Sequence, residues 1–159
     1  MSGATVLERG RRKAYRPLPP AARAEAARHG LTAYRRGDWF LAHELLEPAW
    51  MGSDDPPERA LHSGLIKLAA AGVHAARGNR VGLARNLGGA RERLGPLVED
   101  RTDDAAADPG RTPRPPAPGI VEDLDLVGLL ADIDRQIRDL ESGGPIADPP
   151  DLRPAGTTR

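Results

Sequence analysis

The apolar residues of this chain recur at helical spacing, and no stretch shows the alternation that is typical of a strand. The clearest stretch has apolar positions separated by 4, 3, 4 and 3 residues, at Leu126, Leu130, Ile133, Ile137 and Leu140. Residues three or four apart lie on the same face of a helix. Such a chain builds a core by packing helix against helix, so we expect an all-α fold.

Glycine, proline and short polar residues divide this pattern into about five helices. Short connections between the middle helices favour a compact antiparallel bundle. We expect a break near Gly30 in the first helix, and weak points at Gly88, Gly89 and Pro96 that end the fourth. The predicted helices cover about residues 20–36, 39–50, 56–77, 80–97 and 123–141.

Three polar stretches rich in glycine and proline are expected to be disordered, because they cannot bury enough apolar surface to offset the entropy of ordering. The first is a basic N-terminal arm at residues 1–18, and the last is a C-terminal tail at residues 142–159. The third is a Pro-rich loop at residues 101–119, inserted into a helical domain that spans residues 19–141.

Composition excludes several function classes. The chain has no cysteine, which rules out a disulfide framework, thiolate catalysis and thiolate metal sites. No apolar run approaches the roughly 18–20 residues that a membrane span requires, so we expect no membrane association and a cytoplasmic location. The phosphate-binding loop, the dinucleotide fingerprint and the nucleophile elbow are all missing from the sequence.

The predicted helix at residues 39–50 carries the most informative side chains. On the helical wheel, Glu47 and three aromatic residues each fall within about 60° of His43, and the aromatic residues form an expected aromatic wall of Trp39, Phe40 and Trp50. This helix is apolar nearly all round, so we expect it to be largely buried. A buried ionisable group without a partner costs several kcal/mol. His43 and Glu47 should therefore have polar partners.

The next predicted helix offers those partners on one stripe. Lys67 could pair with Glu47, and His74 could approach His43, which would give a buried polar network of four side chains. Gly64 and Gly72 would let a neighbouring helix come close. The remaining histidines, His29 and His62, are expected to be ordinary side chains.

Two interpretations of this cluster stay open. In the first, His43, Glu47 and His74 bind a divalent metal such as zinc, and Glu44 acts as a general base. The metal would lower the pKa of its bound water toward about 7 and supply a hydroxide nucleophile. In the second, the cluster is a hydrogen-bond network that fixes how the helices pack.

The same residues resemble a bacterial family, the domain of unknown function numbered 309. Its pattern reads roughly G-x-[FY]-F-E-A-H-E-x-L-E-x-x-W, then G-L-I-Q-x-A, then H-x-x-x-G-N. The resemblance covers about residues 28–95. It rests on residues 36–47 (RGDWFLAHELLE), Trp50, residues 64–71 (GLIKLAAA), His74 and residues 78–79 (GN).

The resemblance implies a small all-helical domain without an assigned role, for which the general label is predicted metal-dependent hydrolase. It implies an aromatic position at Trp50, a helix-start position at Asn79, and polar functional positions at His43, Glu44, Glu47 and His74. The chain departs from the pattern at Lys67, where the family usually has glutamine, and at Pro48. A cation at position 67 opposes a nearby metal but suits an ion pair with Glu47.

Three function classes follow from these features. We expect a structural or binding module of unknown ligand that forms a homo-oligomer, with Trp39, Phe40 or Trp50 at an interface. The alternative is a metal-dependent hydrolase. Nucleic-acid binding is the least favoured class, because only the N-terminal arm is markedly basic.

Overall fold

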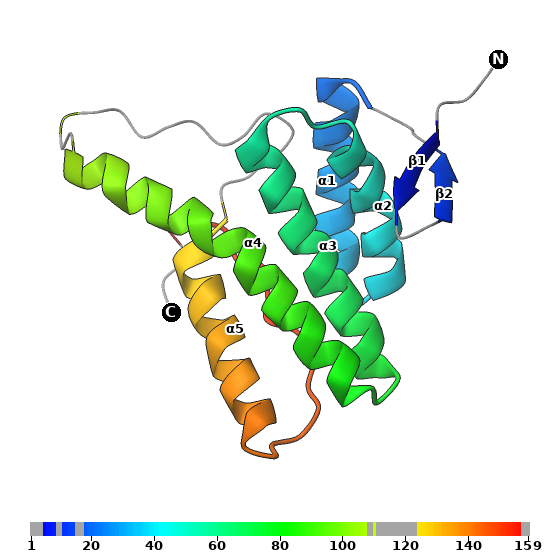
Figure 1. Cartoon of the computed structure of the whole chain (residues 1–159), viewed down its shortest axis with the longest axis vertical. Coiled ribbons are helices and arrows are strands. Elements are labelled where there is room, and N and C mark those ends of the chain that lie inside the picture. The colour runs from blue at the N-terminus through cyan, green and yellow to red at the C-terminus, as the bar shows by residue number, and fades with distance from the viewer. Residues whose placement is uncertain (1–4, 9–10, 15–17, 108–109, 111–123, 157–159) are drawn as a thin grey trace.

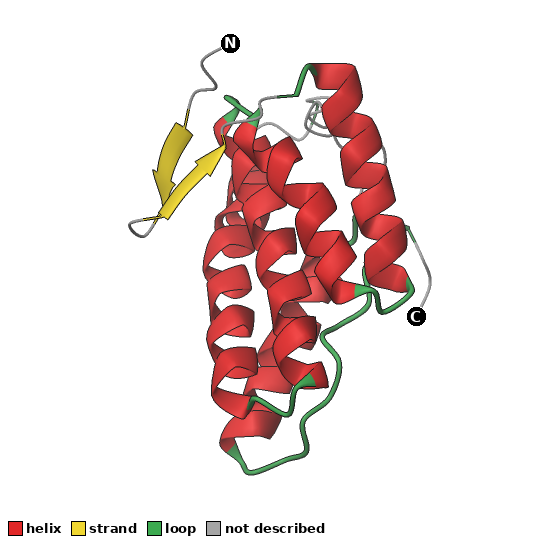
Figure 2. Cartoon of the chain, turned by 90° about the vertical axis from the view of Figure 1, so that its right-hand side faces the viewer, coloured by secondary structure: helices red, strands yellow, loops and turns green. Residues whose placement is uncertain are grey.

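The computed structural model describes residues 5–8, 11–14, 18–107, 110 and 124–156, and its helices form one bundle (Figure 1). Consecutive helices pack side by side, as a second view also shows (Figure 2). The predicted all-α fold with five helices is therefore confirmed. Within the described residues, no helix combines the length and apolarity needed to cross a membrane. The helices are α1 (Pro20–Arg35), α2 (Trp39–Met51), α3 (Pro56–Ala76), α4 (Arg80–Ala107) and α5 (Leu126–Glu141).

Aspartates begin three of these helices. The carboxylate of Asp38 accepts a hydrogen bond from a backbone N–H in the first turn of α2, and Asp55 and Asp125 do the same for α3 and α5. These bonds satisfy amides that would otherwise lack a partner at a helix start. Gly37, at φ = 76°, provides the left-handed residue between α1 and α2.

Two predicted interruptions are wrong, because α1 and α4 run through their glycines. A Cβ at Gly30 would lie 2.7 Å from Cγ of Leu46, so this glycine lets α1 and α2 pack closely instead of breaking the helix. Helix α4 continues past Pro96 to Ala107. The packing of α4 against α3 and α5 outweighs the destabilisation of about 1 kcal/mol that each glycine causes inside a helix. Residues 101–107, predicted to be disordered, are thus helical, while residues 108–109 and 111–119 lie outside the described residues.

The N-terminal arm also differs from the prediction. Strand β1 (Thr5–Glu8) pairs antiparallel with strand β2 (Arg11–Ala14), and Val6 lies opposite Lys13. Each strand has only four residues, too few for an alternating pattern that would stand out in the sequence. The rest of this arm, apart from Leu18, lies outside the described residues.

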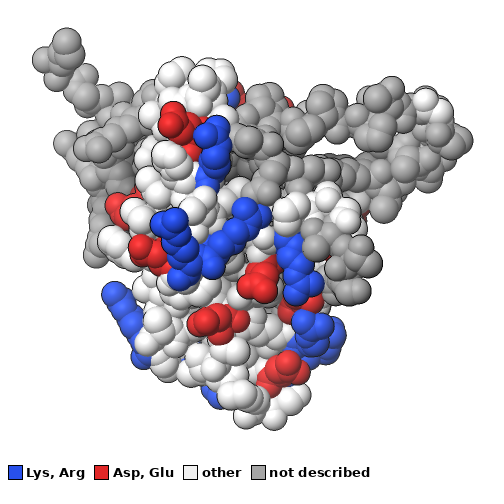
Figure 3. All heavy atoms as spheres, turned by 180° about the vertical axis from the view of Figure 1, so that it is seen from behind, with Lys and Arg blue, Asp and Glu red and all other residues white. Residues whose placement is uncertain are grey.

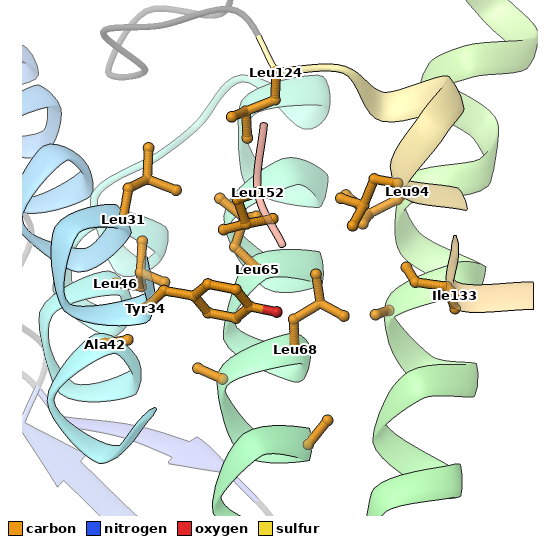
Figure 4. Packing of buried hydrophobic residues seen from close by; sticks show 14 of the residues in the cluster. Leu31, Tyr34, Ala42, Leu46, Leu65, Leu68, Leu94, Leu124, Ile133 and Leu152 are labelled. Atoms are coloured by element: carbon orange, nitrogen blue, oxygen red, sulfur yellow. The ribbon is translucent and has the colours of Figure 1, made fainter. Parts of the chain in front are cut away.

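The core lies between α1, α3, α4 and α5, and leucine fills most of it (Figure 4). Tyr34 of α1 crosses this space with its ring among the leucines. The fully buried large apolar side chains come from every helix: Leu31, Tyr34, Leu46, Leu65, Leu68, Leu83, Leu87, Leu94 and Ile133.

Residues 142–156, which we name the C-terminal strap, are ordered, so the predicted disorder is wrong for them. The side chain of Leu152 is 3% exposed and lies between α1 and α4 (Figure 4). Arg35 donates two hydrogen bonds to its carbonyl oxygen, and the Tyr34 hydroxyl donates to that of Pro150 at 2.7 Å. Burial raises the pKa of Tyr34, with Asp151 and Asp148 adding to the shift, so the hydroxyl stays a donor. Side chains of the bundle therefore donate hydrogen bonds to backbone carbonyl groups of this proline-rich segment.

A buried polar cluster lies beside α1 and the start of α3, where the sequence predicted nothing unusual. Glu58 and His62 are fully buried one turn apart, and Arg23 donates to Oε1 of Glu58 at 2.9 Å. Neither ring nitrogen of His62 has a hydrogen-bond partner among the described residues. Burial, and secondarily the charge of Arg23, lowers the pKa of His62 to about 4.

We predict that Leu152→Ala lowers the free energy of unfolding by about 2–3 kcal/mol, because it removes a buried side chain from the core and leaves a cavity. Asp151→Ala, which changes an exposed neighbour, should cost less than about 0.5 kcal/mol. Urea unfolding monitored by circular dichroism measures both. Equal stability of Leu152→Ala and the parent would show that the C-terminal strap adds nothing to the core.

We predict that His62 makes the fold acid-sensitive. Between its ordinary pKa of 6.5 and its folded value of about 4, the unfolded chain binds a proton that the folded chain does not. The free energy of unfolding should therefore fall by about 3 kcal/mol as the pH drops through this window. His62→Leu should remove this loss, whereas His29→Leu, at an exposed histidine, should retain it. A loss that persists in His62→Leu would assign the acid sensitivity to other groups.

Candidate functional site

A pocket of about 580 Å³ opens between α2, α3 and α4. Each helix presents side chains at spacings of three and four residues, which is why one face of each lines the space. The lining residues are His43, Glu47 and Trp50 of α2; Ser63, Ile66, Lys67, Ala70 and His74 of α3; Asn79 before α4; and Val81, Gly82, Arg85, Asn86 and Arg93 of α4.

The four residues of the predicted polar network meet in this pocket. His43, Glu47, Lys67 and His74 all line it, although they come from two different helices. The predicted burial is wrong, because each of the four is partly exposed. Helix α2 fully buries only Ala42, Leu46 and Ala49, while Trp39 and Leu45 pack against the core and stay partly exposed. The site residues therefore face a space that a ligand can enter.

The three residues of the predicted aromatic wall lie in three different environments. The Trp39 ring meets that of Tyr34 edge-on at 4.9 Å and fills the space above Gly72. Phe40 is 64% exposed. Trp50 lines the pocket and stacks against the guanidinium of Arg59 at 4.3 Å. Only Trp50 can contact a ligand in the pocket.

Asn79 determines which ring nitrogen of neutral His74 carries the proton. Its side-chain oxygen accepts the backbone N–H of Gly82 at 2.9 Å, which fixes the orientation of the amide. The amide nitrogen lies 3.1 Å from Nδ1 of His74 and must donate to it. Neutral His74 therefore carries its proton on Nε2, and this nitrogen is a hydrogen-bond donor. A donor nitrogen cannot bind a metal, so this geometry favours a ligand that accepts hydrogen bonds.

Arg93 is a site residue that the sequence analysis missed. Its Nε donates to Oγ of Ser63 at 2.7 Å, and its Nη1 donates to the carbonyl of Gly89 at 2.9 Å. No carboxylate pairs with Arg93 among the described residues. Two neutral acceptors thus hold this guanidinium in one orientation at the pocket wall, and no carboxylate of the described residues neutralises it.

Lys67 brings a second cation to the same place. Its Cδ and Nη1 of Arg93 each lie 3.3 Å from the position that a Cβ at Gly89 would occupy. The absence of a side chain at Gly89 lets the two cationic side chains converge. The aliphatic stem of Lys67 thus lies beside Arg93, and both side chains line the pocket.

The group of side chains whose spacing would suit a metal ion differs from the predicted ligand set. One ligand atom from each of His43, Glu44 and Glu47 lies within 4.8 Å of the others. The Glu44 side chain is 54% exposed and does not line the pocket, and its Oε1 lies 3.8 Å from Nδ1 of His43. His74 lines the pocket but does not belong to this group.

The family of domains of unknown function DUF309 matches residues 27–86, from the middle of α1 to the first half of α4. No curated protein and no solved structure matches the chain. The matched segment includes His43, Glu47, Lys67 and His74 and ends before Arg93. Residues 27–86 of the chain therefore match the DUF309 family, a domain whose function is uncharacterised.

Proposed function

We propose that this chain is a binding module whose pocket takes a small anionic ligand. The observation that carries this proposal is the guanidinium of Arg93, which two neutral groups hold in place and which pairs with no carboxylate of the described residues. The side chain of Lys67 lies beside it. Charge-assisted hydrogen bonds from a guanidinium held in place are among the strongest that a protein offers to an oxyanion.

The other polar groups of the pocket support an anion. Lys67, Arg85 and Arg93 line it, whereas Glu47 is its only carboxylate among the described residues. His74 adds a hydrogen-bond donor through Nε2. The excess of positive charge and of donors favours an acceptor-rich ligand over a cation.

A second candidate function is the metal-dependent hydrolase, with His43, Glu47 and His74 as predicted ligands and Glu44 as predicted base. The observation in its favour is the grouping of His43, Glu44 and Glu47. A bound divalent metal would supply a Lewis acid and an activated water. Lys67 and the Nε2–H of His74 work against it, which is why the anion is our first proposal.

The predicted homo-oligomer and cytoplasmic location remain proposals. Exposed Phe40 and Leu41, adjacent on α2, support a contact between copies. Light scattering that gives twice the chain mass of 17.0 kDa would support the oligomer, and a concentration-independent monomer would contradict it. Nucleic acid remains disfavoured, because basic and acidic side chains intermingle on the face shown in Figure 3.

We predict that Arg93→Gln weakens the binding of an oxyanion by about tenfold or more, because it removes a charged hydrogen-bond donor worth about 1.5–3 kcal/mol. Inorganic phosphate, titrated by calorimetry at low ionic strength, is a suitable probe. The matched control is Arg91→Gln, on the same helix, since Arg91 pairs with Asp134 of α5 away from the pocket. Equal binding by both variants and the parent would contradict an anion site at Arg93.

Metal content separates the two candidates. The hydrolase predicts about one zinc or similar ion per chain after purification without chelator, and loss of that ion in His43→Ala and in Glu47→Ala. The anion-binding pocket predicts far less than one ion, with no change in either variant. Elemental analysis beside a thermal melt of each variant distinguishes lost metal from lost folding.

A further inference from the structure

We infer that the ligand is an organic oxyanion with two parts: an anionic group bound by Ser63, Lys67 and Arg93, and a planar apolar group against Trp50, Ile66 and Ala70. This inference rests on the proposed anion-binding function and identifies the class of ligand. We name the first set of residues the anion subsite and the second the apolar wall.

The size of the pocket argues for an organic ligand. Pockets that bind organic molecules commonly measure about 300–1,000 Å³, and this pocket, at about 580 Å³, lies within that range. An inorganic anion would fill a small fraction of the space. The remaining volume leaves room for a body attached to the anionic group.

The anion subsite offers several donors to one oxyanion. Arg93 uses Nε and Nη1 on Ser63 and Gly89, so its Nη2 has no hydrogen-bond partner among the described residues. The hydroxyl oxygen of Ser63 accepts from Arg93, which leaves its proton to donate elsewhere. Together with Lys67, which lines the same pocket, these groups suit an anion with several acceptor oxygens, such as a phosphate monoester.

The apolar wall lies at the same end of the pocket as the anion subsite. Arg59 stacks on the Trp50 ring and donates to the Trp50 carbonyl at 3.3 Å, which places Trp50 beside the first half of α3. Ser63 follows Arg59 by one helical turn. A ligand that reaches Arg93 and Ser63 therefore has Trp50 next to it.

The composition of the wall favours a planar group. Ile66 and Ala70, one turn apart on α3, line the pocket together with the Trp50 indole. Arg59 does not line the pocket, although it stacks on Trp50, so it steadies the indole from outside the pocket. A flat aromatic group packs well against a rigid indole and the two small aliphatic surfaces.

Three simple probes separate the two parts of the ligand. Phenyl phosphate carries the ring and the anion, inorganic phosphate carries the anion alone, and phenol carries the ring alone. Dissociation constants for each are measured by calorimetry on the full chain, the Arg93→Gln variant and the Trp50→Leu variant. Phe40→Leu is the matched control, because Phe40 is an exposed aromatic residue of the same helix outside the pocket. A thermal melt confirms that each variant is folded.

We expect phenyl phosphate to bind at least tenfold more tightly than phosphate or phenol. Trp50→Leu should reduce the affinity for phenyl phosphate to that for phosphate and leave phosphate binding unchanged. Arg93→Gln should weaken both phosphates, and Phe40→Leu should change nothing.

Different failures have different meanings. Equal affinities for phosphate and phenyl phosphate, or an unchanged ratio in Trp50→Leu, would overturn the two-part ligand while leaving the anion site standing. Phenol binding as tightly as phenyl phosphate would overturn the role of the anion subsite. Failure of both phosphates to bind would overturn this inference together with the proposed function.

Discussion

The close packing of α3 against its two neighbours positions the rest of the structure. Gly64 lies directly under Leu94 of α4, and Gly72 lies directly under Trp39 of α2, so that a Cβ at either position would overlap the facing side chain. These two contacts hold α3 between α2 and α4. Each of the three helices then turns a polar stripe toward the same space, because helical periodicity places such a stripe next to each core stripe. The pocket thus results from the packing that forms the core.

The two faces of α3 show how one helix serves both purposes. Leu65 and Leu68 are buried in the core, whereas Ser63 and Lys67 line the pocket. A rigid scaffold is what a binding site needs, since its polar groups must keep their orientation before a ligand arrives. Arg93 illustrates this: a serine and a backbone carbonyl hold it, not a flexible acid that would also neutralise it.

Periodicity predicted the five helices, and the polar stripes of two of them predicted that His43, Glu47, Lys67 and His74 would meet. Burial was harder to predict, because a helix that is apolar nearly all round can face a pocket and solvent as well as a core. Arg93 went unnoticed since a lone arginine on a helix has the pattern of a solvated residue, and its role depends on the fold that brings Ser63 to it. The order of residues 142–156 depends in the same way on donors from distant helices, among them Arg35, Tyr34 and Gln136.

We propose that the pocket presents hydrogen-bond donors and positive charge to its ligand. The ¹⁵N chemical shifts of the two ring nitrogens of His74 test this, recorded by NMR with the ring neutral, before and after the addition of zinc. We expect a proton on Nε2 and an unprotonated Nδ1, as the bond from Asn79 requires, with no change on adding zinc. A proton on Nδ1, with an Nε2 signal that shifts on adding one equivalent of zinc, would contradict an anion-binding pocket and favour a metal site.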